Sequence, residues 1–143
     1  MKKKWIAISL FVSLFSLMTV KVIKDQLYVN KIEKKFLLNG TFYQSDDSFN
    51  YYELQDEEYQ GKLAVSLKDD VTTGSFTIPS NHDGKDVIGI YSYGFANRSN
   101  ISVNIPDTIQ VIDYEAFFNT NFSNTKITIP YSVKKMGTAA FFH

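Results

Sequence analysis

The chain contains no cysteine among its 143 residues. This absence excludes a disulfide framework, a thiolate metal site and a cysteine nucleophile. A lipoprotein anchor is excluded as well, because the lipid is attached to a cysteine. Tryptophan occurs once, so the aromatic content of 15% is carried by twelve Phe and nine Tyr. With 44% hydrophobic residues the chain can build a core, and its composition is not that of a disordered protein.

An excess of positive charge is also absent from most of the chain. Residues 1–24 hold five Lys and no acidic residue, whereas residues 25–143 hold ten basic and fifteen acidic residues, a net charge of −5. A nucleic-acid-binding protein usually presents a basic face to the phosphates. The charge distribution therefore predicts no nucleic-acid partner.

Residues 1–24 have the features of an export signal. Three lysines follow Met1, and from Trp5 to Ile23 only Lys21 interrupts a run of apolar or hydroxylated residues. At about 1.5 Å per residue, these 19 residues nearly match a hydrocarbon core of about 30 Å. No small-x-small cleavage site is found near residues 17–22, so an uncleaved signal anchor that crosses the membrane through residues 5–23 is favoured over a signal peptide. The leading lysines favour the cytoplasmic side, which predicts an extracytoplasmic domain; cleavage would instead give a secreted one.

Two further segments precede the repeats. Residues 25–40 place apolar residues at loosely helical spacing and end at Gly40, which predicts a juxtamembrane stalk or helix. Residues 41–71 carry short apolar runs broken by acidic residues, which is typical of a strand-rich lead-in. The acidic residues lack the spacing of a twelve-residue calcium loop, so a solvated surface is the preferred interpretation and no metal site is predicted.

Residues 72–143 repeat a pattern three times. Each unit opens with an apolar-polar-Ile-Pro step, continues with two apolar residues three apart, and reaches a small residue followed by Phe. We call the units coil 1 (76–100), coil 2 (103–124) and coil 3 (127–143). The phenylalanines at the equivalent position of the three units, Phe95, Phe117 and Phe141, are 22 and 24 residues apart. Coil 1 carries five inserted residues after Pro79. A period of this length predicts a solenoid.

The repeat physics leads to specific expectations. Alternation in each Ile-Pro step should turn its first and third residues inward and its middle residue outward. Proline should end the strand, and the pair of apolar residues should turn the chain back over the core. The Phe that ends each pattern should fill the layer between neighbouring coils.

This pattern resembles the BspA-type leucine-rich repeat family, whose unit reads approximately I-T-I-P-x-x-V-x-x-I-G-x-x-A-F. Residues 76–143 match it, and Gly137 supplies the glycine of the unit, whereas Asp113 stands at that position in coil 2. The resemblance implies a leucine-rich-repeat solenoid of β-rich coils with short helical turns, preceded by the β lead-in and by the signal or transmembrane helix. It also implies a cell-surface role in adhesion.

Catalytic motifs are missing from the sequence. The two histidines, His82 and His143, have no nucleophile at a meaningful spacing, and no phosphate-binding, dinucleotide-binding or H-E-x-x-H motif occurs. We therefore expect no enzyme activity, no catalytic residue and no cofactor.

The outward strand positions are the candidate ligand-binding face. They form a polar ladder with its flanking residues: Ser75, Thr77, Ser102, Asn104, Lys126 and Thr128. Tyrosines in the turns, Tyr91, Tyr93, Tyr114 and Tyr131, are further candidates because Tyr is an economical contact residue. The alternative for the polar ladder is a solvated sheet face that binds nothing, and the alternative for the tyrosines is packing of their rings along the coils.

The sequence thus predicts a non-catalytic, extracytoplasmic interaction module that binds a protein or glycan at the cell surface. Coil 3 stops in mid-unit at Phe141 and Phe142, without the polar cap that terminal coils need. Two alternatives therefore remain: a structural subunit that docks a partner through its C-terminal coil, or a truncated remnant of a longer surface repeat protein.

Overall fold

The computed structural model describes residues 36–123 and 126–143. The expected membrane segment (1–24) and the expected stalk up to residue 35 lie outside the described residues. Among the helices of the described part, none is long and apolar enough to cross a membrane.

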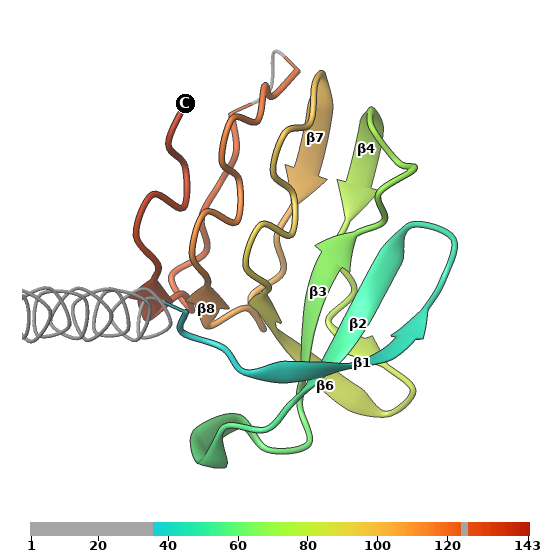
Figure 1. Cartoon of the computed structure of the whole chain (residues 1–143), viewed down its shortest axis with the longest axis vertical. Helices are drawn as coiled ribbons and strands as arrows, with labels where there is room; N and C mark the ends of the chain where they lie inside the picture. The colour runs from blue at the N-terminus through green and yellow to red at the C-terminus, as the bar shows by residue number, and fades with distance from the viewer. Residues whose placement is uncertain (1–35, 124–125) are drawn as a thin grey trace, which may run out of the picture. The chain divides into compact units, whose positions relative to one another are not determined.

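The regular elements of the described residues are strands and one short 3₁₀ helix (Figure 1). The longer sheet has the order β1-β2-β3-β6-β8-β9, with β5 attached to β6, and β4 pairs with β7 in a second sheet. The elements are β1 (Gly40–Ser45), β2 (Phe49–Leu54), η1 (Glu57–Tyr59), β3 (Leu63–Leu67), β4 (Gly74–Thr77), β5 (Asn81–His82), β6 (Lys85–Ile90), β7 (Ile101–Asn104), β8 (Val111–Ile112) and β9 (Lys135–Met136).

The first three strands form an antiparallel meander that leads into the repeats. β1 pairs with β2, and β2 pairs with β3. Asp46 stabilises the first turn, because its Oδ1 accepts hydrogen bonds from the amides of Ser48 (2.9 Å) and Phe49 (2.7 Å). All five residues of β3 are buried. β3 then pairs in parallel with β6 and so begins the repeat sheet.

The main sheet of the repeats uses a different segment from the one expected. The apolar pairs were expected to turn the chain back, but the second residue of each pair (Ile90, Ile112 and Met136) lies in a strand, and these strands, β6, β8 and β9, pair in parallel. This expectation was wrong because Val87–Ile88 and Val111–Ile112 are adjacent apolar residues that are buried on both faces of the sheet. Short β-branched runs of this kind suit a strand with cover on both sides.

The Ile-Pro steps form strands in coils 1 and 2. β4 and β7 pair in parallel, with Thr77 opposite Asn104. The predicted alternation is confirmed, since Ile78, Val103 and Ile105 are buried whereas Thr77 and Asn104 are exposed. Residues 127–130 of coil 3 are not a strand, which corrects the expectation of a third one.

The turns before and after each Phe join the coils by a further row of hydrogen bonds. The amide of Phe95 donates to the carbonyl of Ala116 at 2.7 Å, and the amide of Phe117 donates to the carbonyl of Ala140 at 2.7 Å. The expected short helical turns are not found in the described part of residues 71–143, where these turns are non-helical. Instead, each turn contains a residue with left-handed φ at the same repeat position: Tyr93 (56°), Glu115 (49°) and Ala139 (56°).

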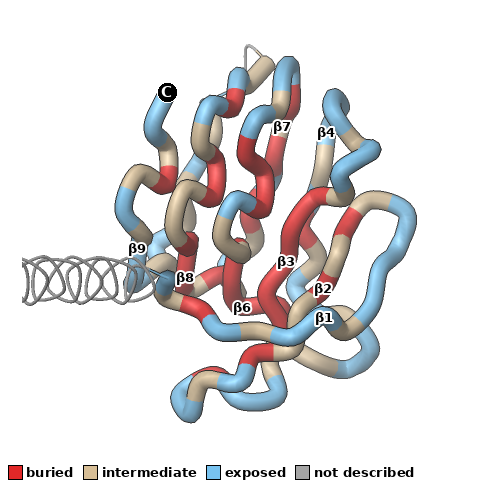
Figure 2. Tube along the Cα trace, viewed as in Figure 1, coloured by how far each residue is buried: buried red, intermediate tan, exposed pale blue. Residues whose placement is uncertain are grey.

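A stack of phenylalanine rings runs through the core of the coils. The ring centroids of Phe95 and Phe117 are 5.1 Å apart, and those of Phe117 and Phe141 are 4.8 Å apart. Phe95 and Phe117 are fully buried, and burial in Figure 2 follows the inner side of successive coils. The expectation that this Phe fills the layer between coils is confirmed.

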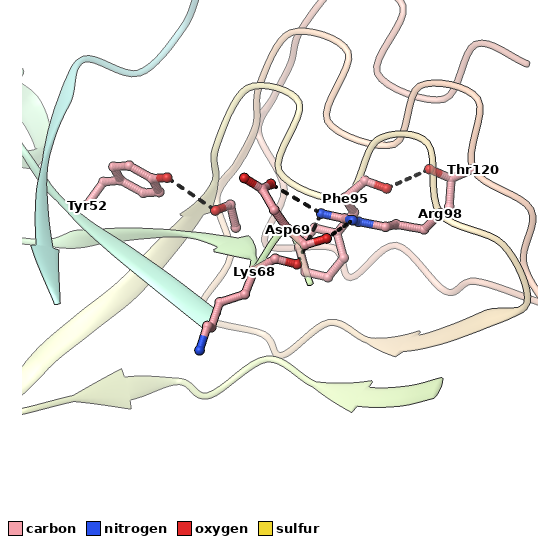
Figure 3. A network of polar contacts seen from close by, with 7 residues as sticks. Tyr52, Lys68, Asp69, Phe95, Arg98 and Thr120 are labelled. Atoms are coloured by element: carbon pink, nitrogen blue, oxygen red, sulfur yellow. Dashed lines mark hydrogen bonds and ion pairs between the residues drawn. The ribbon is translucent and has the colours of Figure 1, made fainter. Parts of the chain in front are cut away.

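Polar contacts join the lead-in to coil 1 and coil 1 to coil 2 (Figure 3). The guanidinium of Arg98 donates to the carbonyls of Lys68 (3.2 Å) and Asp69 (3.3 Å). The buried hydroxyl of Thr120 donates to the carbonyl of Phe95 at 2.7 Å. Arg98 also forms an ion pair with the carboxylate of Asp69 at 3.8 Å. The hydrogen bonds themselves end on backbone carbonyls, so they fix the path of the chain.

Residues 36–39 form a strap across the outer face of the main sheet. Asp113 is fully buried, and its Oδ1 and Oδ2 accept hydrogen bonds from the amides of Leu37 (2.7 Å) and Leu38 (3.1 Å). Leu38 is buried over Gly89, where an added Cβ would lie 2.6 Å from the Leu38 side chain. The part of the expected stalk that is described is therefore not helical, and it packs on the repeats.

Candidate ligand groove between the second and third coils

The predicted ligand face lies on the outer side of β4, β7 and the first residues of coil 3. Thr77, Asn104 and Thr128 are all exposed, as their outward positions require. Ser75 and Lys126 are exposed as well, and Ser102 is half-buried. Only part of this face is concave: Ser102, Asn104, Lys126 and Thr128 line one pocket, and Ser75 and Thr77 do not.

This pocket exists because the second sheet ends at β7. Beyond the pair β4–β7, a single parallel bridge links Ile101 with Phe122. Among the described residues, no backbone hydrogen bond joins 102–105 to 126–130. On the opposite side, the amide of Gly137 still donates to the carbonyl of Ile112 at 2.7 Å. Coils 2 and 3 are therefore joined at the main sheet and at the turns but separate on the ligand face.

The pocket between β7 and coil 3, called the upper pocket, has a volume of about 410 Å³. Aliphatic and hydrogen-bonding residues alternate along the two segments that border it; on β7, Asn104 points outward whereas Val103 and Ile105 point into the core. It is lined by Ser102, Val103, Asn104, Ile105, Asp107, Lys126, Thr128, Ile129, Pro130 and Tyr131.

A second pocket, called the lower pocket, lies next to the first and has a volume of about 230 Å³. Asp107 lines both pockets, so they adjoin at the turn that follows Pro106. The lower pocket is lined by Lys62, Asp86, Ile88, Asp107, Thr108, Gln110, Ser132 and Lys134. We call the two pockets together the coil 2–3 groove.

Two hydroxyl groups of the lower pocket lack a hydrogen-bond partner within the described residues. They belong to Thr108 and Ser132, and both oxygens are buried. Each residue stands two positions after the proline of its coil, so the repeat itself places them side by side. A buried polar group without a partner costs about 1–3 kcal/mol, and a bound molecule that supplies a partner removes this cost.

The four candidate tyrosines have different surroundings. Tyr91 stacks on Tyr52 with ring centroids 4.3 Å apart and donates to the carbonyl of Gly40 at 3.1 Å. Tyr93 and Tyr114 contact each other edge to face at 5.6 Å. Tyr131 differs, because it is fully exposed and lines the upper pocket. Of the four, Tyr131 is the one placed to contact a ligand in the groove.

The sequence-based reasoning missed Asp107, Thr108 and Ser132, together with the lysines of the lower pocket. A signal for the groove was present in the repeat spacing. Nine residues separate Phe117 from Ile127 at the start of coil 3, whereas seven residues separate Phe95 from Val103 at the start of coil 2. The two additional residues lengthen the connection at the place where the strand ladder stops.

His82, the histidine that catalysis would have needed, is part of the packing of the lead-in. Its ring stacks on Tyr51 with centroids 3.8 Å apart, and the Tyr51 hydroxyl donates to Asp46 Oδ2 at 2.6 Å. Burial alone would raise the pKa of Asp46, but this hydrogen bond and the amides of Phe49 and Ser48 lower it below its usual value. Across residues 36–123 and 126–143, no group of three His, Asp or Glu side chains is placed to hold a metal ion.

Stacked parallel coils of 22–24 residues around a phenylalanine core define a repeat solenoid of the leucine-rich class. A family model described as BspA type leucine-rich repeat region (6 copies) matches residues 71–143. The chain therefore belongs to the BspA-type leucine-rich repeat family. Repeat domains of this family typically serve as binding modules and are generally non-catalytic. No curated protein and no solved structure matched the chain.

Proposed function

We propose that this chain is an extracytoplasmic, non-catalytic module that binds a protein or glycan of the cell surface through the coil 2–3 groove. The observation that carries the proposal is the break in the strand ladder after β7, which leaves four of the predicted ligand-face residues around one concave site. Concave sites with a few convergent polar groups are the usual places for ligand binding.

The test is binding of the full chain, held in amphipol, to arrays of surface glycans and of extracellular-matrix proteins. The double variant Asn104→Ala, Thr128→Ala should bind its array ligand at least tenfold more weakly, because both side chains line the groove. Thr77→Ala is the matched control, since Thr77 occupies the same repeat position on β4 outside the pocket. Equal binding by all three proteins, or no binding to either array, would contradict the proposal.

The membrane tether forms a separate part of the proposal. Residues 5–23 are proposed to hold the chain in the membrane, with the repeats on the outer side, on the strength of the lysines that precede the apolar run. Because the chain has no cysteine, a single Asp70→Cys variant supplies one exposed thiol in the described domain. A membrane-impermeant maleimide should label it on intact cells. Labelling only after lysis would contradict this topology, and label in the culture medium would mean cleavage and secretion.

A docking partner at coil 3 is the second candidate function. Met136 and Phe142 are exposed, and Phe142 stacks on Phe118 with ring centroids 6.0 Å apart. The exposed ring therefore continues a stack rather than standing alone. Under this proposal the full chain should self-associate or bind another subunit in analytical ultracentrifugation, and Phe142→Asp should abolish that association.

A further inference from the structure

We call the coil 2–3 groove a trough because its two pockets share Asp107; the lower pocket also reaches Lys62 of the lead-in and Asp86 and Ile88 of coil 1. Its two pockets meet at Asp107, which turns two shallow sites into one longer one. Together they span from the ligand face at Asn104 to the start of the main sheet at Gln110. A trough of this kind suits a chain-like ligand better than a compact cofactor.

The lining offers hydrogen-bonding groups of every type. Asn104 supplies an amide, Thr108, Thr128 and Ser132 supply hydroxyls, Asp107 supplies a carboxylate, and the lysines supply ammonium groups. All of these side chains except the lysines are short, so their polar groups lie close to the backbone. Sugar hydroxyls both donate and accept hydrogen bonds, so they can satisfy all of these groups. Thr108 and Ser132 line the lower pocket, and their buried hydroxyls have no partner among the described residues, so each can donate to and accept from such a ligand once the side chain turns toward the pocket.

The apolar surface of the groove is limited in size. Val103 and Ile105 line the upper pocket but are buried core residues, so its apolar surface comes mainly from the half-buried Ile129 and Pro130. Protein interfaces usually depend on a large anchor residue that is seated in a well-packed, desolvated pocket, and this groove offers no such seat. Small aliphatic patches between polar groups suit the C–H faces of a sugar ring.

Tyr131 provides a flat contact surface beside the upper pocket. Its side chain is fully exposed, so no neighbouring group has to move before a ligand contacts the ring. Tyrosine supplies a large, rigid, amphipathic contact at a low entropic cost, and its face can stack on a pyranose ring.

The charge of the groove is nearly balanced. Three lysines, Lys62, Lys126 and Lys134, are opposed by Asp86 and Asp107, and residues 25–143 as a whole are acidic. A polyanionic ligand would meet the two carboxylates inside the trough and a negative domain around it. This balance favours an uncharged ligand over a sulfated or uronic-acid polymer.

We propose that the coil 2–3 groove binds a neutral oligosaccharide, with Tyr131 stacking on one ring and Asn104, Asp107, Thr108 and Ser132 hydrogen-bonding to its hydroxyls. This inference rests on the proposed function and narrows its ligand from a protein or glycan to one class. Asp107, shared by the two pockets, then binds at the middle of the sugar chain.

The test is a titration of the full chain with defined probes, read by isothermal calorimetry and saturation-transfer NMR. The probes are maltohexaose and chitohexaose as neutral sugars, a heparin hexasaccharide as a polyanion, and a library of eight-residue peptides. The protein should be held in amphipol, because sugar-headed detergents would compete for the groove. At least one neutral hexasaccharide should bind, and it should bind at least tenfold more tightly than the heparin fragment.

Variants then locate the bound sugar. Tyr131→Ala should weaken binding at least tenfold, Tyr131→Phe should retain most of it because the ring remains, and Asp107→Asn should weaken it. Tyr93→Ala is the matched control, since Tyr93 is a half-exposed tyrosine outside both pockets.

The other outcomes are distinguishable. If peptides bind in a manner that depends on Asn104 while neither neutral sugar binds, the sugar inference is overturned and the proposed interaction function stands. Tighter binding of the heparin fragment than of either neutral sugar would also overturn it. If no probe binds and the glycan and matrix arrays are negative as well, both proposals fail.

Discussion

The boundary between coils 1 and 2 and the boundary between coils 2 and 3 are built from the same repeat, yet only one of them is closed on the ligand face. At the first boundary β4 pairs with β7 along four residues. At the second, the corresponding segment of coil 3 forms no strand. Both boundaries keep the main sheet and the turn row. A repeat solenoid can therefore lose strand pairing on one face between two coils, while the hydrogen bonds of the main sheet and of the turns hold the coils together.

The largest effect is expected from the ring stack, which both boundaries share. Phe117→Ala should lower the free energy of unfolding by about 3–5 kcal/mol, because it empties the layer between Phe95 and Phe141. Urea unfolding of the full chain in amphipol, followed by circular dichroism, measures this loss. A loss below about 1 kcal/mol would mean that coil 3 does not depend on the stack; Phe42→Ala, in the exposed part of β1, is the control.

The next effect concerns the strap, which crosses from the lead-in to coil 2. Asp113→Asn should lower the free energy of unfolding by about 1–3 kcal/mol, because the amide NH₂ that replaces one oxygen faces backbone N–H donors. Hydrogen exchange of the Leu37 and Leu38 amides should accelerate in the same variant. Asp107→Asn makes the same chemical change at an exposed site and should leave both measurements unchanged.

Asp113 also gives a dependence on pH. Burial raises its pKa above the usual value, against the hydrogen bonds from the amides of Leu37, Tyr114 and Leu38. The folded protein therefore binds this proton more tightly than the unfolded chain, whose carboxyl titrates near pH 3.8. The contribution of Asp113 to stability is greatest below that pH and decreases as the pH rises through the raised pKa. The stability difference between the wild type and Asp113→Asn should therefore shrink over this window, and a difference that grows would contradict the pKa direction.

A smaller change would close the second boundary. Deleting Asn124 and Thr125 restores the 22-residue spacing between Phe117 and Phe141, as between Phe95 and Phe117. A strand ladder extended from β7 into coil 3 should raise the free energy of unfolding by about 1 kcal/mol, since each net hydrogen bond contributes about 0.5–1.5 kcal/mol. Binding to the groove should fall at least tenfold. The full-length double substitution Asn124→Ala, Thr125→Ala should change neither quantity, and a deletion variant that binds normally would separate the groove from the spacing.

The smallest effects are expected on the outward ladder of the two boundaries. Thr77→Ala, Asn104→Ala and Thr128→Ala should each change the free energy of unfolding by less than about 0.5 kcal/mol, because these side chains are exposed. Losses above about 1 kcal/mol at any of the three would show that the residue supports the fold rather than a ligand face.

The core of the repeats could be predicted from local pattern. The Ile-Pro alternation correctly placed Ile78 and Val103 inside and Thr77 and Asn104 outside, because a strand points successive side chains to opposite faces. The assignment of the main sheet failed, since the same apolar runs fit a turn or a strand covered on both faces. That choice depends on the strap that covers Ile88 and Val111, and the strap comes from residues 36–39, far away in the sequence.

By itself the sequence determined the period, the phenylalanine stack and the direction of the polar ladder, because each follows from the spacing of neighbouring residues along one coil. Only the tertiary structure decided the two features that give the domain its particular shape. Asp113 stands where coil 3 has Gly137, and it becomes a buried acceptor only when residues 37 and 38 cross over it. The groove likewise requires two coils to lie side by side with unequal connections, so that Thr108 and Ser132 line one pocket and find no hydrogen-bond partner among the described residues. Both features depend on contacts between segments that are far apart in the sequence, and the spacing of neighbouring residues does not specify which distant segments will meet.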